Sequence, residues 1–231
     1  MKALLVDLDD TLLDYSGGVD ECWEAACVSA VPASVDQTAL LRALAETRVW
    51  FWSDPVRQRR ERTDMLGAWT RIAAHALERC GASVEGVAEA IGRDYAARRR
   101  QRMQLFPEAL QCLQQWRARG TPLALVTNGD AREQRWKIET YGLAPYFDVM
   151  VIEGEFGAGK PDEVVYRHAL QVLGVRADEA WMVGDHLEFD VDAPQRLGVR
   201  GVWVDRPARG LPAGAAVRPY RIIQNLRELS L

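Results

Sequence analysis

The stretch Ala-Leu-Leu-Val-Asp-Leu-Asp-Asp-Thr-Leu at residues 3–12 decides the fold of this chain. Its apolar start, residues 3–6, predicts a buried parallel strand. Asp7 and Asp9 follow where that strand would end, and strand alternation directs both to the same side. Ligands of open α/β sheets bind at the carboxyl ends of strands. Two like charges held close need a divalent cation, a shared proton or both. A strand followed by an Asp-rich turn is the simpler alternative.

Composition narrows the classes of protein to which the chain can belong. Its 231 residues, 48% of them hydrophobic, can build one large domain or two small ones around a substantial core. A net charge of −4 argues against a nucleic-acid-binding face. The four cysteines form no C-x-x-C pair, which is typical of reduced thiols in a cytoplasmic protein. No apolar run is long enough for a signal peptide or a membrane span, so we expect neither.

Strands and helices alternate in the first and last parts of the chain. Two helical patterns, 107–119 and 162–173, are each followed by a glycine that ends them. The alternation predicts an α/β fold, a Rossmann-like parallel sheet with helices on both faces. The strand-like runs lie at residues 3–8, 122–127, 148–152, 180–184 and 201–204.

Residues 17–103 differ from the rest because they contain no convincing strand. Their apolar periodicity predicts helices at 19–30, 36–52, 63–80 and 84–102. We therefore expect a small all-helical domain at 17–103, beside the crevice that Asp7 and Asp9 face, and a core made of 1–16 and 104–231. The alternative is that these helices simply extend the core domain.

Three further groups of polar residues follow predicted strands. Thr127 and Asn128 precede a glycine, and a hydroxyl and turn amides there could hold phosphate oxygens. Lys160 lies in a tight loop from which its charge could reach a phosphoryl group. Asp185 and Asp190, five residues apart at a strand end, suit a hard cation such as Mg²⁺.

A nearby pattern imitates a nucleotide-binding loop. Residues 154–160 have the spacing G-x-x-x-x-G-K of a P-loop. Pro161 stands where that motif needs Ser or Thr, and it lacks the backbone N–H that a phosphate cradle would use. We therefore do not expect hydrolysis of nucleoside triphosphates by a P-loop.

Taken together, D-x-D-x-T at 7–11, Thr127, Lys160 and G-D-x-x-x-x-D at 184–190 resemble the four motifs of the haloacid dehalogenase-like (HAD) hydrolase superfamily, in order. The helical insert looks like the mobile cap of that family. Residues 125–130 and 182–185 look most like its capped phosphatase branch of N-acylneuraminate-9-phosphatase and pyrimidine 5′-nucleotidase.

The resemblance implies a role for each matching residue. Asp7 would be the nucleophile that takes the phosphoryl group, and Asp9 the general acid and then the general base. Thr127 and Lys160 would hold phosphate oxygens, with Lys160 also orienting Asp7. Asn128 would contribute its backbone amide.

The resemblance also implies a Mg²⁺ site. Asp7, Asp185 and the backbone carbonyl of Asp9 would bind the ion, and Asp190 would assist. One departure from the family is Asp10, where many members carry glycine.

These roles imply a Mg²⁺-dependent phosphomonoesterase that works through an aspartyl phosphate. Its substrate would be a small phosphorylated metabolite, a sugar phosphate or a nucleotide monophosphate. We expect no nucleic-acid or membrane partner, and a monomer or homodimer. Arg57 and Arg60, in a predicted loop between two helices, are the first candidates to read the leaving group, because arginine suits carboxylates and phosphates.

Three other functions compete with this one. A phosphosugar mutase would use the same core but keep the phosphoryl group. A haloacid dehalogenase would need neither Mg²⁺ nor a second acid, so Asp9, Asp185 and Asp190 argue against it. A non-catalytic binding protein could keep the fold as a scaffold, but the intact set of acids weighs against that.

Overall fold

The chain forms two compact units. The computed structural model describes residues 1–82 and 84–229. One unit, here the core unit, consists of Met1–Tyr15 and Gln104–Leu231, and the other, the helical unit, is Ser16–Met103. Each unit is described by itself below.

The core unit is built on a six-stranded sheet in which all neighbouring strands are parallel, in the order β5-β4-β1-β6-β7-β8. Every residue of β1 is buried, as expected for a strand covered on both faces. The predicted α/β fold and its five strands are confirmed, and β8 at the edge is an addition. The bounds are β1 Ala3–Val6, β4 Leu123–Thr127, β5 Val149–Ile152, β6 Ala180–Gly184, β7 Arg200–Val204 and β8 Arg221–Ile223.

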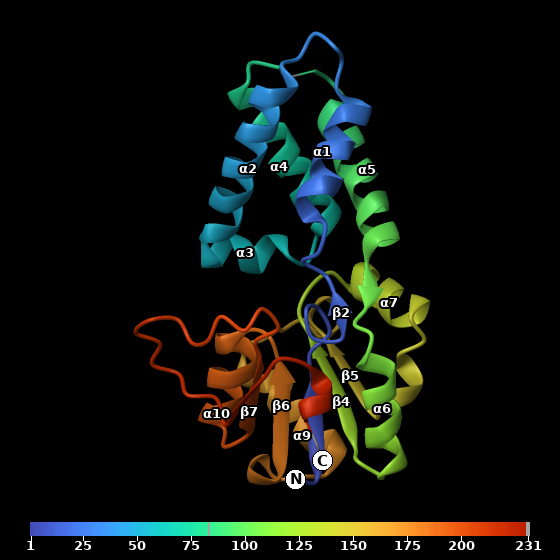
Figure 1. Cartoon of the computed structure of the whole chain (residues 1–231), viewed down its shortest axis with the longest axis vertical. Helices are drawn as coiled ribbons and strands as arrows, with labels where there is room; N and C mark the ends of the chain where they lie inside the picture. The colour runs from blue at the N-terminus through green and yellow to red at the C-terminus, as the bar shows by residue number, and fades with distance from the viewer. Residues whose placement is uncertain (83, 230–231) are drawn as a thin grey trace. The chain divides into compact units, whose positions relative to one another are not determined.

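Helices flank this sheet (Figure 1). The longest, α9, packs its apolar stripe against β4 and β5, and Gly174 in the left-handed region (φ +66°) ends it. A π-helical segment, Leu187–Asp192, follows β6 and leads into α10. The helices are α6 Ala109–Ala118, α7 Ala131–Thr140, α8 Glu153–Phe156, α9 Glu163–Leu173 and α10 Ala193–Arg196.

A short antiparallel ribbon marks the point where the chain leaves and re-enters the core unit. β2 (Leu13–Asp14) pairs with β3 (Gln104–Leu105), so that Leu13 lies opposite Leu105. Two-residue strands leave no periodic signal in a sequence, which is why the pattern did not reveal them. The ribbon ties together two segments that lie about 90 residues apart in the sequence.

Among the described residues, the helical unit contains helices and no strand, as predicted. α5 packs against α1 and α4, and α4 also packs against α2 (Figure 1). Aromatic rings fill its centre: Trp23 stacks on Tyr95 at 3.8 Å, and Trp69 meets the same ring edge-on at 5.2 Å. The helices are α1 Val19–Ala30, α2 Gln37–Ser53, α3 Pro55–Glu61, α4 Met65–Arg79 and α5 Val87–Arg102.

The predicted loop around Arg57 and Arg60 is wrong, because these residues belong to the helix α3. Asp54 accepts a hydrogen bond from the Arg57 backbone N–H at 2.7 Å, and Pro55 occupies the first helical turn. Both features favour a helix start.

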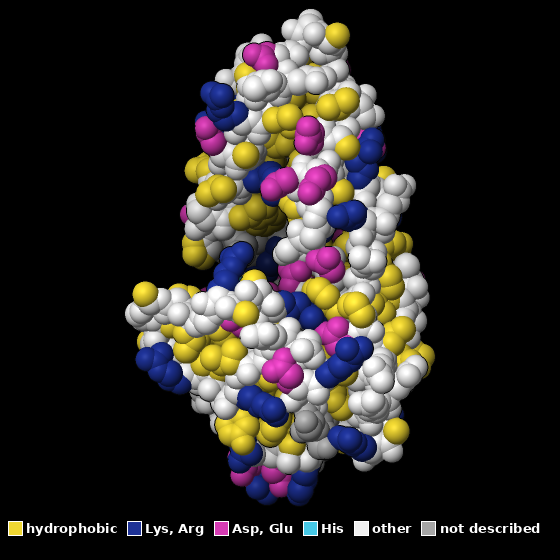
Figure 2. Space-filling view, viewed as in Figure 1, with side chains coloured by type: hydrophobic (Ala, Val, Ile, Leu, Met, Phe, Trp, Pro, Cys, Tyr) yellow, Lys and Arg dark blue, Asp and Glu magenta, His cyan; other side chains and the backbone are white. Residues whose placement is uncertain are grey.

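The surface carries mixed charge. Figure 2 shows basic and acidic side chains interspersed on the face that it presents. Within the described residues, no helix is both long enough and apolar enough to cross a bilayer.

Leu5→Ala should lower the free energy of unfolding by roughly 2–5 kcal/mol, because Leu5 is fully buried in the apolar cluster between the sheet and α9. Val164 on α9 is 47% exposed, so Val164→Ala is the matched control and should cost less than about 0.5 kcal/mol. Urea unfolding followed by tryptophan fluorescence measures both. Equal losses in the two variants would contradict this account of the core.

Candidate active site

Polar side chains converge at the carboxyl edge of the three central strands. β1 lies between β4 and β6, so Asp7 after β1 lies between Thr127 at the end of β4 and Asp185 after β6. The Asp7 backbone N–H donates to the carbonyl of Val183 at 3.0 Å, which continues the parallel pairing to the start of the site. The sheet thus assembles residues that are far apart in the sequence.

A buried lysine joins two of the acids. Lys160 Nζ donates to Asp7 Oδ1 and to Asp190 Oδ1, each at 2.6 Å. The three side chains are 3%, 8% and 1% exposed. Burial alone would lower the pKa of Lys160, but the charges of Asp190 and Asp7 outweigh it and raise that pKa well above its ordinary value. Lys160 is therefore a permanent cation beside Asp7.

Three acidic side chains lie together at this site. Asp7, Asp185 and Asp190 each offer a carboxylate oxygen, and these oxygens lie within 4.8 Å of one another. Burial, and then the charge of Asp190, raise the pKa of Asp7 to about 7 despite Lys160. Burial and the charges of Asp7 and Asp190 raise the pKa of Asp185 to about 9. Crowded oxygen ligands of this kind fit Mg²⁺, which prefers carboxylates.

Backbone and side-chain contacts fix the two acids that follow β6. Trp203 Nε1 donates to the carbonyl of Asp185 at 2.7 Å, and the His186 backbone N–H donates to Asp190 Oδ2 at 3.0 Å. Gly184 makes room for this arrangement, since a Cβ there would lie 2.3 Å from the carboxyl carbon of Asp190. The geometry explains a glycine at this position of the motif.

The side chain of Asn128 holds the loop that carries Lys160. Its Nδ2 donates to the carbonyl of Lys160, and its Oδ1 accepts from the Lys160 backbone N–H, both at 2.7 Å. Asn128 thus supports the lysine through its side chain. The earlier expectation concerned its backbone amide, and that role stays a prediction.

Asp9 lies in a second group of polar residues that the sequence did not reveal. Lys137 Nζ donates to both Asp9 oxygens at 2.8 Å, and Gln134 Nε2 donates to Asp9 Oδ2 at 3.1 Å. Gln134 Nε2 also donates to Thr127 Oγ1 at 2.6 Å. Two buried polar residues of α7 therefore connect the acid with the threonine at the end of β4.

The turn after Asp9 explains the departure at Asp10. Asp10 has φ +59°, a left-handed backbone in which glycine is favoured and Asp is tolerated. Its side chain accepts from the Tyr15 backbone N–H at 3.0 Å, which stabilises the turn. Arg206 also holds this turn, because its Nη2 donates to the carbonyl of Thr11 at 2.6 Å while its guanidinium lies 3.3 Å from the centre of the Phe106 ring.

The two predicted arginines of the helical unit differ in their surroundings. Arg57 Nε donates to the carbonyl of Phe51 at 2.6 Å, and its guanidinium lies 4.1 Å from the centre of the Trp50 ring. Arg60 is 74% exposed and bonds Glu61 at 2.8 Å. A hollow of about 450 Å³ beside α3 is lined by Pro55, Val56, Arg59 and Arg60. Arg57 therefore supports the α2–α3 corner, whereas Arg60 remains accessible.

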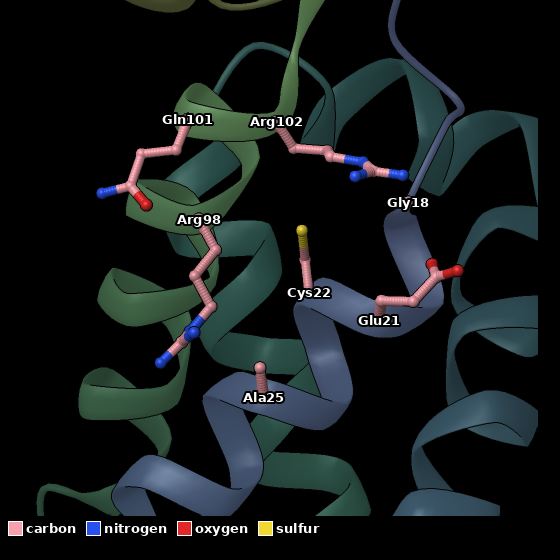
Figure 3. Close-up of a pocket in the computed structure, with 7 residues that line it drawn as sticks. All are labelled: Gly18, Glu21, Cys22, Ala25, Arg98, Gln101 and Arg102. Atoms are coloured by element: carbon pink, nitrogen blue, oxygen red, sulfur yellow. The ribbon is translucent and has the colours of Figure 1, made fainter.

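A second hollow of about 290 Å³ lies between α1 and α5 (Figure 3). Its walls include Cys22 and Glu21 from α1 and Arg98 from α5, which already pairs with Asp94 at 2.9 Å. Gly18 and Arg102 also line it, and a Cβ at Gly18 would lie 2.7 Å from Arg102 Nε. No residue of the predicted site lines it.

Comparison with known proteins identifies the family. Residues 1–198 match the model of a protein family described as "haloacid dehalogenase-like hydrolase". The chain belongs to the haloacid dehalogenase-like hydrolases. The resemblance drawn from the four motifs is therefore confirmed.

Relatives of this HAD hydrolase include phosphatases. It is 36% identical to phosphoserine phosphatase of Thermus thermophilus over 252 aligned positions, covering 100% of this chain and 98% of that protein. It is 35% identical to N-acylneuraminate-9-phosphatase of Rattus norvegicus over 108 positions, 46% and 43% of the two chains. The solved HAD hydrolase YfnB of Bacillus subtilis shares the fold, with a TM-score of 0.75, 20% identity and coverage of 99% and 96%.

The contribution of Asp7 and Asp185 to the stability of this HAD hydrolase should fall as pH rises from about 4 to about 9 when divalent cations are absent. The unfolded Asp7 and Asp185 lose their protons near 3.8, whereas the folded carboxyls keep them to about 7 and about 9. The folded state therefore binds more protons across this window, so rising pH favours unfolding, and the effect levels off above it.

Adding Mg²⁺ should raise the Tm more at pH 8 than at pH 5, because the ion binds ionised carboxylates. Thermal melts with Mg²⁺ and with EDTA at both pH values measure this. Asp185→Asn should remove most of the difference, while Asp178→Asn, at an exposed position, should leave it unchanged. An unchanged Mg²⁺ effect in Asp185→Asn would place the ion elsewhere.

Proposed function

We propose that this HAD hydrolase is a Mg²⁺-dependent phosphomonoesterase acting on a small phosphorylated metabolite, a sugar phosphate or nucleotide monophosphate. The observation that carries the proposal is the buried contact of Lys160 with Asp7, beside the acids Asp185 and Asp190. A nucleophilic carboxylate approaching an anionic phosphate needs positive charge close by. The phosphatase names of its relatives support the same reaction class.

Asp7 is the nucleophile in the first half of the proposed reaction. A carboxylate oxygen of Asp7 bonds to phosphorus while the bond between phosphorus and the leaving oxygen breaks, and Asp9 gives its proton to that oxygen. Lys160 stays bound to Asp7 and reduces the repulsion between carboxylate and phosphate. Thr127 and the Asn128 backbone amide hold phosphate oxygens.

Asp9 reverses its role in the second half. It takes a proton from water as the water oxygen bonds to phosphorus and the bond to Asp7 breaks, which releases inorganic phosphate and restores the Asp7 carboxylate and the protonated Asp9. Asp7, Asp185 and the backbone carbonyl of Asp9 would hold Mg²⁺, with Asp190 assisting. The chemistry that the ion supplies when bound is neutralisation of the phosphoryl oxygens and the crowded acids.

The helical unit, in this proposal, acts as a cap that reads the leaving group. Core residues contact the phosphoryl group, which all substrates share, so discrimination must come from elsewhere. Of the two predicted arginines, Arg60 is the better reader because it is the more exposed. A phosphosugar mutase stays the second candidate inside this fold, and release of inorganic phosphate distinguishes the two.

The purified protein should hydrolyse 4-nitrophenyl phosphate with Mg²⁺ and lose this activity in EDTA. Asp7→Asn should lower kcat at least about 1,000-fold while the protein stays folded, because an amide cannot serve as the nucleophile. Asp178→Asn, an exposed change of the same kind, is the control. Rapid quench with ³²P-labelled substrate should label Asp7 in the wild type. A label on histidine or serine, or full activity in EDTA, would overturn the proposal.

Arg60→Ala should lower kcat/KM for the best metabolite in a phosphate screen, phosphoserine included, by roughly 10-fold or more. The value for 4-nitrophenyl phosphate should change little, because that small substrate offers few groups to a cap. Arg57→Ala should instead lower the Tm, since its contacts with Phe51 and Trp50 support the α2–α3 corner. Equal losses for both substrates in Arg60→Ala would show that Arg60 does not discriminate between leaving groups.

A further inference from the structure

The proposed mechanism makes Asp9 a general acid and then a general base, but it gives no role to the two side chains that contact Asp9, Lys137 and Gln134. Lys137 Nζ lies 2.8 Å from each Asp9 oxygen, and Gln134 Nε2 lies 3.1 Å from one of them. Both residues come from the same face of α7, three positions apart. A single helix turn therefore orients the carboxylate.

The ammonium group of Lys137 is buried, and Asp9 is its main partner. Its side chain is 3% exposed, and burying an ammonium group is costly unless it is paired and hydrogen-bonded. Besides Asp9, it donates to Gln134 Oε1 at 2.7 Å and lies 4.2 Å from the centre of the Tyr15 ring. These contacts surround the ammonium and hold it against Asp9.

Gln134 connects Asp9 with Thr127 through hydrogen bonds to both side chains. Its Oε1 accepts from Lys137, so its amide nitrogen must be the group that faces Asp9 and Thr127. Thr127 Oγ1 accepts from Gln134 at 2.6 Å, which leaves the hydroxyl proton to be donated. Its present acceptor, the Asn128 carbonyl, is 3.4 Å away, a long contact that a phosphate oxygen would replace readily.

The choice of lysine at this position is itself informative. Only three lysines, Lys2, Lys137 and Lys160, occur among the 29 basic residues of the sequence. Arginine presents a planar fork, whereas the compact ammonium of lysine can approach both oxygens of one carboxylate and a third acceptor at once. Two of the three lysines are buried against proposed catalytic acids.

We infer that Lys137 and Gln134 are positioning residues for the acid–base step, which they support by fixing Asp9 and aligning it with the phosphate-binding hydroxyl of Thr127. The inference rests on the proposed phosphatase function. Neither residue is assigned a contact with the phosphate ester itself. Each acts through a side chain that is proposed to contact it.

Lys137→Met, which keeps the length and removes the charge, tests the inference. The readout is kcat/KM for aryl phosphates of graded leaving-group acidity and for one alkyl phosphate. A poor leaving group needs a proton from a well-placed Asp9, so we expect a loss of roughly 10- to 100-fold for the alkyl phosphate and a much smaller loss for 4-nitrophenyl phosphate. Lys2→Met, at an exposed position, is the matched control and should behave as wild type.

A double-mutant cycle separates positioning from a general structural role. In an Asp9→Asn background, Lys137→Met should lower the activity toward the alkyl phosphate no further, because the residue that it positions is already disabled. Uniform losses for all leaving groups, or additive losses in the cycle, would overturn the inference. Absence of phosphatase activity in both wild type and Lys2→Met would instead refute the proposed function.

Gln134→Met provides the test if Lys137→Met does not fold. It keeps the Lys137–Asp9 pair but removes the bridge to Thr127. We expect KM to rise for every phosphate, because Thr127 loses its alignment, together with a steeper dependence of kcat/KM on the leaving group. Unchanged KM and unchanged leaving-group dependence in a folded variant would contradict the inference.

Discussion

The contact of Lys160 with both Asp7 and Asp190 is the interaction on which the rest of the site depends. Three ionisable groups are buried there. Burial of charge is stable only when the opposite charges are paired in good geometry and hydrogen-bonded. The surroundings meet this demand: the side chain of Asn128 holds the Lys160 backbone, and Gly184 leaves space for Asp190. Asp185 adds a third carboxyl group with an oxygen within 4.8 Å of those of Asp7 and Asp190, so the geometry that holds the proposed nucleophile also suits a bound cation.

Residues at strand ends could be predicted from the sequence because one rule converts position along the chain into position in space. Apolar runs identified the central strands, and parallel strands present their carboxyl ends at one edge. Asp7, Thr127 and Asp185 therefore had to lie on neighbouring strands once β4, β1 and β6 proved adjacent. The fold class and the helical nature of the insert followed from periodicity alone. The catalytic roles rest on the family motifs and await the experiments above.

Other parts could not be predicted, because their burial depends on tertiary partners. Residues 131–140 contain only two large apolar side chains, so no apolar stripe indicated α7. Lys137 and Gln134 are buried because they pair and hydrogen-bond with Asp9, about 125 residues away in the sequence. Hydrophobic periodicity predicts only which apolar side chains are buried, so it could not indicate these two polar residues. The seven-residue helix α3 was also not predicted from the sequence, although Asp54 and Pro55 do carry the signal of a helix start.

The two acids proposed to act in the reaction contact different buried lysines: Asp7 contacts Lys160, and Asp9 contacts Lys137. Asp7, beside Lys160, has a side chain only 8% exposed, whereas Asp9, beside Lys137, is 23% exposed. A nucleophile benefits from a fixed position out of water, where the charge of its partner is least screened. An acid–base group must meet both the leaving oxygen and the attacking water, so it needs an open side. Pairing Asp7 and Asp9 with different lysines lets one carboxyl group be buried and the other remain accessible, although only one residue separates them in the sequence.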